Sequence, residues 1–252
     1  INYNGVKKSE REDLENKLGI MKGNQITPNM IDRAKILAKR YFDDKGYKNA
    51  EISILQRDDV SNKDQVILDV DIVKKDKMKV RHIIIEGNEK LKRNKITGSF
   101  FKNGAFAKIH EAGKFKNFFK AKKFTPERYE TDKKNLIEKY NELGYRDATI
   151  LEDSVWNEDE KHVNVYIKVD EGQQYYIRNI EWVGNSVLTS DFLNNALGMK
   201  KGDVYNQKLM NKRLKEDEDA VGNYYWNNGY IFYQLDPTEV NIVGDSIDLE
   251  MR

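Results

Sequence analysis

Histidine and acidic side chains are the residues of this sequence that could bind a metal ion or transfer protons. The three histidines, His82, His110 and His162, lie far apart and have no spacing of metal ligands. The stretch H-E-A-G-K, which begins at His110, lacks the second histidine of the H-E-x-x-H motif of zinc proteases. We therefore expect neither a metal centre nor metal-dependent catalysis.

Motifs for phosphate and calcium binding are also missing from the sequence. It contains neither G-x-x-x-x-G-K-[ST] nor G-x-G-x-x-G, so no sequence motif indicates nucleotide binding. The acidic stretch D-D-V-S-N-K-D at residues 58–64 lacks the spacing of a calcium loop and is expected to be a solvated turn. There is no cysteine, and hence no disulfide and no thiolate site. These absences predict a protein that is not an enzyme and needs no cofactor.

The composition favours several small domains over one thick core. Charged residues make up 34% of the chain and hydrophobic residues only 38%, which suits domains with much surface each. Lys and Arg number 44 against 42 for Asp and Glu, giving a formal net charge of +2. A balance this close to neutral predicts no strong attraction to nucleic acid or anionic lipid.

One basic and aromatic stretch, G-K-F-K-N-F-F-K-A-K-K-F at residues 113–124, could contact a partner. Its phenylalanines Phe115, Phe118 and Phe119 share one face of a helix, and lysines separate them. Such a face could bind an anionic surface, such as nucleic acid or lipid headgroups. The alternative is that the aromatic rings pack on their own domain while the lysines are solvated.

A six-residue phrase that ends in Gly-Tyr occurs three times in the chain. The copies are F-D-D-K-G-Y at 42–47, Y-N-E-L-G-Y at 140–145 and Y-W-N-N-G-Y at 225–230. Glycine ends helices because it adopts the left-handed conformation without strain. We therefore predict that Gly46, Gly144 and Gly229 are structural helix stops. The tyrosine after each glycine is expected to pack back on the aromatic residue in the last helical turn.

Each Gly-Tyr phrase belongs to a longer repeated pattern. A strand-like run closed by glycine comes first, then two helices, the second beginning near a cap such as Thr27-Pro28 or Thr125-Pro126. A hairpin with alternating apolar residues follows, as in Q-V-I-L-D-V-D-I-V. This order predicts an α+β fold of three tandem β-α-α-β-β domains, each with two helices on a three-stranded mixed sheet. The predicted domains are residues 1–77, 78–172 and 173–252, the second with an insertion between its helices.

These motifs resemble those of the POTRA domain. The resemblance lies in G-N after the first strand, L-x-x-x-x-G-[DN] before the second helix and Y-x-x-x-G-Y after it, and it covers essentially the whole chain. The insertion in the second unit is similar to the extra length of the third POTRA domain of BamA-like assembly factors, so the units would be the second to fourth. Two features depart from the family pattern. The second unit lacks L-G-x-x-K-G, and the third has 23 residues instead of 19 between cap and stop.

The resemblance implies a scaffold in the periplasm of a Gram-negative bacterium, as the soluble part of an outer-membrane protein. It implies that the partners are unfolded β-barrel outer-membrane proteins and the lipoproteins of an assembly complex, and not nucleic acid. It also implies that the parent chain carries a C-terminal membrane β-barrel outside this sequence. A related secretion or translocation factor with the same module is an alternative.

The resemblance further implies binding by β-augmentation, in which a client strand pairs with an exposed sheet edge. The candidate edge is the looser hairpin strand of the second unit, at Thr149, Ile150, Leu151, Glu152 and Asp153. The alternative is that its two carboxylates protect the edge against pairing. The competing class is an RNA-binding repeat of KH type, but its G-x-x-G loop is missing.

Overall fold

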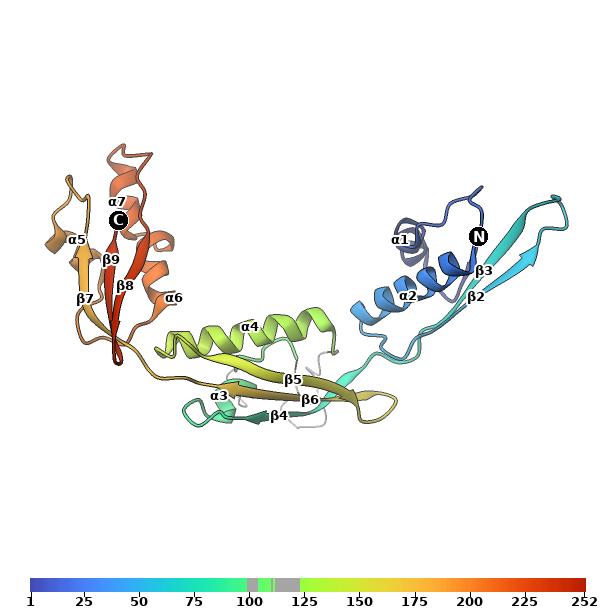
Figure 1. Ribbon diagram of the computed structural model, residues 1–252, viewed down its shortest axis with the longest axis horizontal. Coiled ribbons are helices and arrows are strands. Elements are labelled where there is room, and N and C mark those ends of the chain that lie inside the picture. Colours follow the sequence, from blue (N-terminus) through green and yellow to red (C-terminus); the bar gives the residue numbers. More distant parts are fainter. Residues whose placement is uncertain (99–103, 110, 112–122) are drawn as a thin grey trace. The chain divides into compact units, whose positions relative to one another are not determined.

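Three separate three-stranded sheets, each with its own helices, make up the computed structural model (Figure 1). The structure describes residues 1–252 except 99–103, 110 and 112–122. The three sheets are mixed, which confirms the predicted α+β class of tandem β-α-α-β-β units. Phe115, Phe118 and Phe119 lie outside the described residues.

The first repeat has the strand order β1-β3-β2. Strand β1 pairs in parallel with β3, and β2 pairs antiparallel with it, so β2 is one edge of the sheet. Its elements in chain order are β1 (Asn2–Asn4), α1 (Lys8–Leu18), α2 (Pro28–Asp44), β2 (Glu51–Asp58) and β3 (Val66–Val73).

The middle repeat has the equivalent strand order β4-β6-β5, so that β5 is an edge strand. Its long helix α4 lies beside β5 and β6 (Figure 1). The elements are β4 (Lys79–Glu86), α3 (Arg93–Thr97), α4 (Pro126–Glu142), β5 (Thr149–Asn157) and β6 (His162–Asp170).

The third repeat has the order β7-β9-β8, with β7 parallel and β8 antiparallel to the central strand. Its second helix is interrupted. A π-helical turn follows α6, and the helix resumes as α7 after residues 217–220. The elements are β7 (Tyr176–Trp182), α5 (Ser190–Leu197), α6 (Gln207–Asn211), the π-helical turn (Lys212–Glu216), α7 (Val221–Asn227), β8 (Pro237–Val243) and β9 (Ser246–Met251). This interruption explains why 23 residues, instead of 19, separate the helix cap from the stop glycine in the third repeat.

The central strand of each sheet alternates as its sequence predicts, with one face against the helices. In β3 the buried side chains are those of Leu68, Val70 and Ile72, which pack in one cluster with Ala34 and Ala38 of α2. Burial of such an aliphatic side chain contributes about 1.5–3 kcal/mol. The same face is buried in the other two central strands, at Val163, Val165, Ile167 and Val169 of β6 and at Ile247, Leu249 and Met251 of β9.

Side-chain caps fix the start of each second helix. The Thr27 hydroxyl accepts a hydrogen bond from the Met30 N–H at 3.3 Å. Thr125 caps Arg128 in the same way, also at 3.3 Å. In the third repeat the capping side chain is an amide, and the corresponding bond is 2.8 Å long. Each cap satisfies an N–H group that the first turn of a helix leaves without a partner.

The Gly-Tyr phrase forms the same corner in all three repeats. Gly46, Gly144 and Gly229 have φ angles of 89°, 85° and 86°, in the left-handed region. In each corner the tyrosine ring lies edge-on to the aromatic ring five residues before it, with centroids 6.1–6.3 Å apart. The corner therefore ends the helix and turns the chain toward the first strand of the hairpin.

Gly229 is suited to testing the corner, because a Cβ atom at this position would meet nothing within 4 Å. Gly229→Ala should destabilise the third repeat by about 1–2 kcal/mol, through backbone strain alone. Gly229→Asn should cost less, since asparagine tolerates the left-handed region. Denaturant unfolding of the three proteins measures both effects, and an alanine variant as stable as the wild type would contradict the assignment.

Candidate functional site

The strand singled out by sequence, β5, is an edge strand of the middle repeat. Thr149, Leu151, Glu152 and Asp153 are exposed, Leu151 to 58%, and Ile150 is half-buried. An edge strand presents one row of backbone N–H and C=O groups outward. The structure thus places all five predicted residues on one continuous edge.

A groove runs beside this edge, between β5 and α4. Its volume is about 550 Å³. Seven residues line it, from two helical turns of α4 and from the first half of β5: Lys133, Lys134, Ile137, Glu138, Thr149, Ile150 and Asp153. Its apolar side chains are Ile137 from the helix and Ile150 from the strand. A chain that paired with β5 would therefore place alternate side chains over an apolar surface.

An ion pair crosses the rim of the groove. The Lys133 ammonium lies 3.1 Å from a carboxylate oxygen of Asp153. The two side chains are 18% and 32% exposed. A partly exposed pair of this kind contributes little to stability, about 0–1 kcal/mol, so it can open at little cost. Of the two carboxylates on the edge, Asp153 is thus paired within the protein.

Helix α4 is fixed at the groove by a buried tyrosine–carboxylate contact. The Tyr140 hydroxyl donates a hydrogen bond of 2.8 Å to Glu171, which follows β6. The same carboxylate accepts backbone N–H groups of the loop between β4 and α3, from Glu89, Lys90 and Leu91. Burial raises the pKa of Tyr140, and the bond to Glu171 adds to this. One carboxylate therefore ties the helix to the end of the central strand and to the loop after β4.

A second buried carboxylate holds the segment between α3 and α4. Asp132, on the inner face of α4, is fully buried. Its oxygens accept the backbone N–H groups of Ala107, Lys108 and Ile109 at 2.7–3.1 Å. Several such bonds satisfy a carboxylate that would otherwise be costly to bury. The helix that forms the groove is thus held from both its ends.

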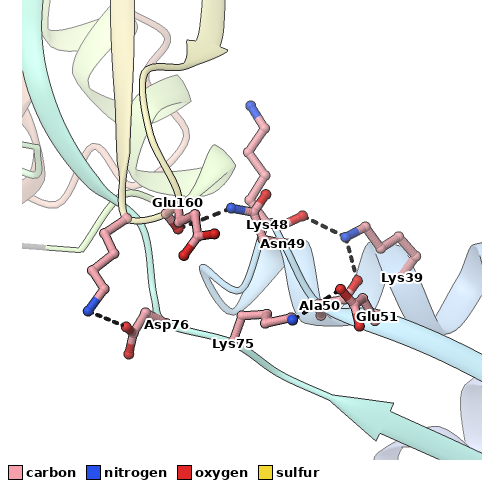
Figure 2. A pocket seen from close by; sticks show the side chains of 9 residues that line it. Lys39, Lys48, Asn49, Ala50, Glu51, Lys75, Asp76 and Glu160 are labelled. Carbon is pink, nitrogen blue, oxygen red and sulfur yellow. Dashed lines mark hydrogen bonds and ion pairs between the residues drawn. The ribbon is translucent and has the colours of Figure 1, made fainter.

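The first repeat has a lysine where the middle repeat has Ile137. Counted back from the corner glycines, Lys39 and Ile137 both stand seven residues before the stop. The Lys39 ammonium donates to the backbone carbonyls of Lys48 and Ala50 at 2.6 and 2.7 Å (Figure 2). The hollow beside Lys39 is consequently lined by charged groups, among them Glu51.

The third repeat fills the same position differently. Seven residues before its stop stands Gly222, and a Cβ atom there would lie 2.3 Å from the Tyr233 hydroxyl. The Tyr233 ring stacks on Tyr225, with centroids 5.6 Å apart. Of the three equivalent positions, the isoleucine of the middle repeat is the one that leaves an apolar groove beside the edge strand.

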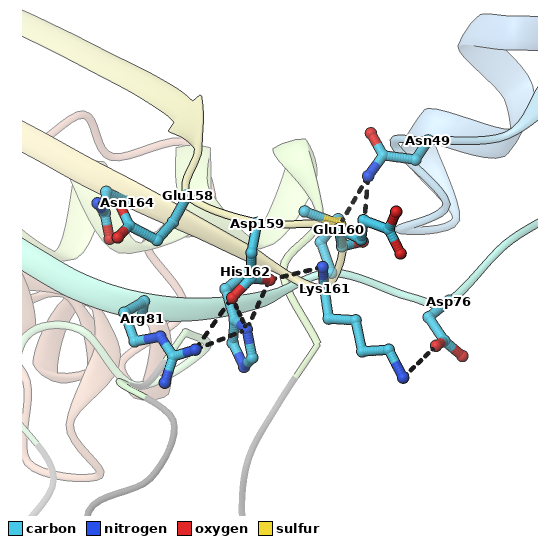
Figure 3. A network of polar contacts seen from close by, with 10 residues as sticks. Asn49, Asp76, Arg81, Glu158, Asp159, Glu160, Lys161, His162 and Asn164 are labelled. Atoms are coloured by element: carbon cyan, nitrogen blue, oxygen red, sulfur yellow. Dashed lines mark hydrogen bonds and ion pairs between the residues drawn. The ribbon is translucent and has the colours of Figure 1, made fainter.

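The histidine of β6 belongs to a polar network at the turn before that strand (Figure 3). His162 lies 2.9 Å from Asp159, whose other oxygen is 3.0 Å from Arg81. The backbone N–H of Lys161, together with these two side chains, holds the pKa of Asp159 well below its usual range. Within the described residues no group of three His, Asp or Glu side chains could hold a metal ion. We infer that this network stabilises the turn between β5 and β6.

The sequence predicts the edge strand β5 but not the groove between β5 and α4. The sequence predicts a second helix here, which contains Lys133 and Ile137, but no wall of a groove, and it predicts Tyr140 only as the partner of the corner tyrosine. When the repeats are aligned on their corner glycines, Ile137 occupies the same position as Lys39 and Gly222. The apolar residue at this position is the feature of the sequence that indicates the groove.

Comparisons with known proteins agree with the architecture. The family model described as "POTRA: Surface antigen variable number repeat" matches residues 1–75, 78–172 and 175–251. The outer membrane protein assembly factor BamA of Neorickettsia risticii (strain Illinois) is 26% identical over 179 residues, 69% of this chain. The chain covers only 22% of that relative's length.

A solved structure has a similar fold. The crystal structure of Haemophilus influenzae BamA POTRA3-5 superimposes with a TM-score of 0.50 at 16% identity, over 99% of this chain and 92% of that one. No helix among the residues with described positions is long and apolar enough to span a membrane.

Tyr140→Phe should remove the bond to Glu171 while keeping the packing, since the first repeat has a phenylalanine, Phe42, at this position. We expect a loss of about 2 kcal/mol in unfolding free energy, because the acceptor is a buried carboxylate. Chemical denaturation at neutral pH measures this loss.

The pH dependence provides a second readout of the same contact. The pKa of Tyr140 is raised in the folded state, so the stability it contributes is fully present below the unfolded pKa of about 10 and is lost as pH rises above it. Tyr140→Phe should therefore lose stability less steeply in alkaline solution than the wild type. Identical slopes would show that the hydroxyl is not held as described.

Proposed function

Because the chain belongs to the POTRA family, we propose that it is a periplasmic scaffold arm of an outer-membrane protein assembly factor. The similarity to BamA of Neorickettsia risticii supports this assignment. The arm would bind unfolded β-barrel proteins and the lipoprotein partners of the assembly complex, without catalysis. The insertion that contains Phe115, Phe118 and Phe119 is a further candidate contact with such partners.

The observation that carries the proposal is the β5 edge with its apolar groove. Backbone groups at a sheet edge bind any extended chain, whatever its sequence, and this suits a receptor for many clients. The groove adds selectivity for apolar side chains at every second position, because Ile137 and Ile150 face one side of the paired chain. Strands of membrane β-barrels alternate in this way, with apolar side chains toward the lipid.

We assign client binding to the middle repeat because its Ile137 gives the groove beside the edge strand an apolar wall. Lys39 makes the hollow of the first repeat polar, and Tyr233 packs over Gly222 in the third. In all three repeats the second strand, β2, β5 or β8, flanks the central strand as an edge. We therefore expect selectivity for apolar clients to depend on this helical position.

Ile137→Lys should abolish this difference by giving the middle repeat the side chain of the first. By equivalence with Lys39, the new ammonium has the carbonyls of Arg146 and Ala148 within reach, so the fold is retained. We expect binding of a labelled barrel-strand peptide to weaken by about tenfold or more, because the apolar contact is lost. Fluorescence anisotropy measures the affinity.

The matched control is Ile36→Lys, which adds the same charge on an exposed face of α2, where Ile36 is 68% accessible. It should leave peptide affinity unchanged. Equal effects of the two substitutions, or none for Ile137→Lys, would contradict the groove assignment.

Pairing through the backbone is tested with N-methylated peptides. In a strand, alternate residues direct their N–H groups to opposite edges. Methyl groups on the amides of one edge should therefore abolish binding, while methyl groups on the other edge should be tolerated. Two peptides of equal affinity would show that the groove binds side chains without adding a strand to β5.

A further inference from the structure

The third repeat exposes a cluster of large apolar side chains beyond its corner. We call Trp226, Tyr230, Ile231 and Phe232 the aromatic tip. Their side chains are 57%, 45%, 52% and 92% exposed, respectively. Trp226 belongs to α7, and the other three lie in the loop that leads to β8. Contiguous exposed apolar groups of this size mark interaction surfaces.

The other two repeats show that the corner itself does not require these residues. After Gly-Tyr the first repeat continues with Lys48-Asn49 and the middle repeat with Arg146-Asp147, each followed by a buried alanine. In the third repeat four residues, Ile-Phe-Tyr-Gln at 231–234, precede the corresponding buried residue, Leu235. The loop is two residues longer, and its polar pair is replaced by an apolar one.

The longer loop is anchored so that its apolar residues point outward. Tyr233 stacks on Tyr225 and places its hydroxyl against Gly222, where any larger side chain would collide with it. The anchor fixes the base of the loop in the core of the repeat. Ile231 and Phe232, directly before it, are left on the outside.

Charge is missing from the whole segment around the tip. Residues 220–235 contain no Asp, Glu, Lys or Arg, the longest such stretch in a chain that is 34% charged. The nearest charges on either side are acidic, at Asp219 and Asp236. The segment itself therefore offers no cationic side chain to an anionic surface.

We propose that the aromatic tip inserts into the interfacial region of a lipid bilayer with zwitterionic headgroups. Tryptophan and tyrosine favour the headgroup level of membranes, and isoleucine and phenylalanine favour the apolar region below it. An exposed apolar loop suits a fluid interface, whereas a protein partner would have to supply a matching pocket. The uncharged asparagines Asn227 and Asn228 beside the tip enter a headgroup region without the cost of burying an ion.

Flotation with phosphatidylcholine vesicles tests the proposal on the whole chain. The wild type should float with the vesicles, and a change from low to high salt should alter the bound fraction less than twofold, since the tip carries no charge. The double variant Ile231→Asn, Phe232→Asn should reduce partitioning by about tenfold or more. Both positions are exposed, so the fold of the repeat is retained.

A matched control removes two exposed apolar side chains elsewhere. Leu55 and Val60 of the first repeat are 62% and 100% exposed, and Leu55→Asn, Val60→Asn should float like the wild type. Lipids brominated in the acyl chain give a second readout. They should quench tryptophan fluorescence in the wild type more than in Trp226→Phe.

Three outcomes would overturn the proposal. The first is equal flotation of the wild type and the tip variant. The second is binding confined to anionic vesicles and lost at high salt. The third is a wild type that does not float but dimerises through the tip in sedimentation experiments, which would assign the tip to a second copy of the chain.

Discussion

The left-handed glycine corner is the constraint on which each repeat depends. It ends the second helix at a fixed residue and sends the chain into the strand that becomes the sheet edge. Were the helix one residue longer, the strand would begin one residue later and its alternation would be reversed, placing apolar side chains in water. The aromatic pair at the corner, such as Tyr140 with Tyr145, packs the turn against the helix it ends. Edge, groove and tip all follow from where this corner lies.

With the corner fixed, single side chains decide which surface each repeat presents beside it. The position seven residues before the stop contacts the loop after the corner in the first and third repeats, and it lines the groove beside the edge strand in the middle one. Lysine there satisfies carbonyl groups, isoleucine leaves an apolar groove, and glycine admits a tyrosine from the loop. None of these changes disturbs the central strand or the helix caps. A repeated scaffold can therefore acquire different surfaces at little cost to its folding.

The fold could be predicted from sequence because its signals are local. Alternation in Leu68, Val70 and Ile72, the caps at Thr27 and Thr125 and the three corners each act within a few residues. The groove could not be predicted in this way, since it arises where Ile137 of a helix meets Ile150 of a strand. Burial of Glu171 and Asp132 also escaped prediction, because a carboxylate is buried only where a particular set of N–H groups converges on it.

The same reasoning explains why the exposed surfaces lie where they do. Each sheet has one face on its helices, so a repeat can expose apolar groups at its edge strand or in its corner loop without losing core. The middle repeat uses the first option and the third repeat the second. Both sites are built on elements fixed by buried contacts, Tyr140 with Glu171 in one case and Tyr233 with Gly222 in the other. A binding surface on so small a domain needs such an anchor. Ordering a mobile loop or strand on binding would cost conformational entropy, and this cost would offset much of the free energy gained from the new contacts.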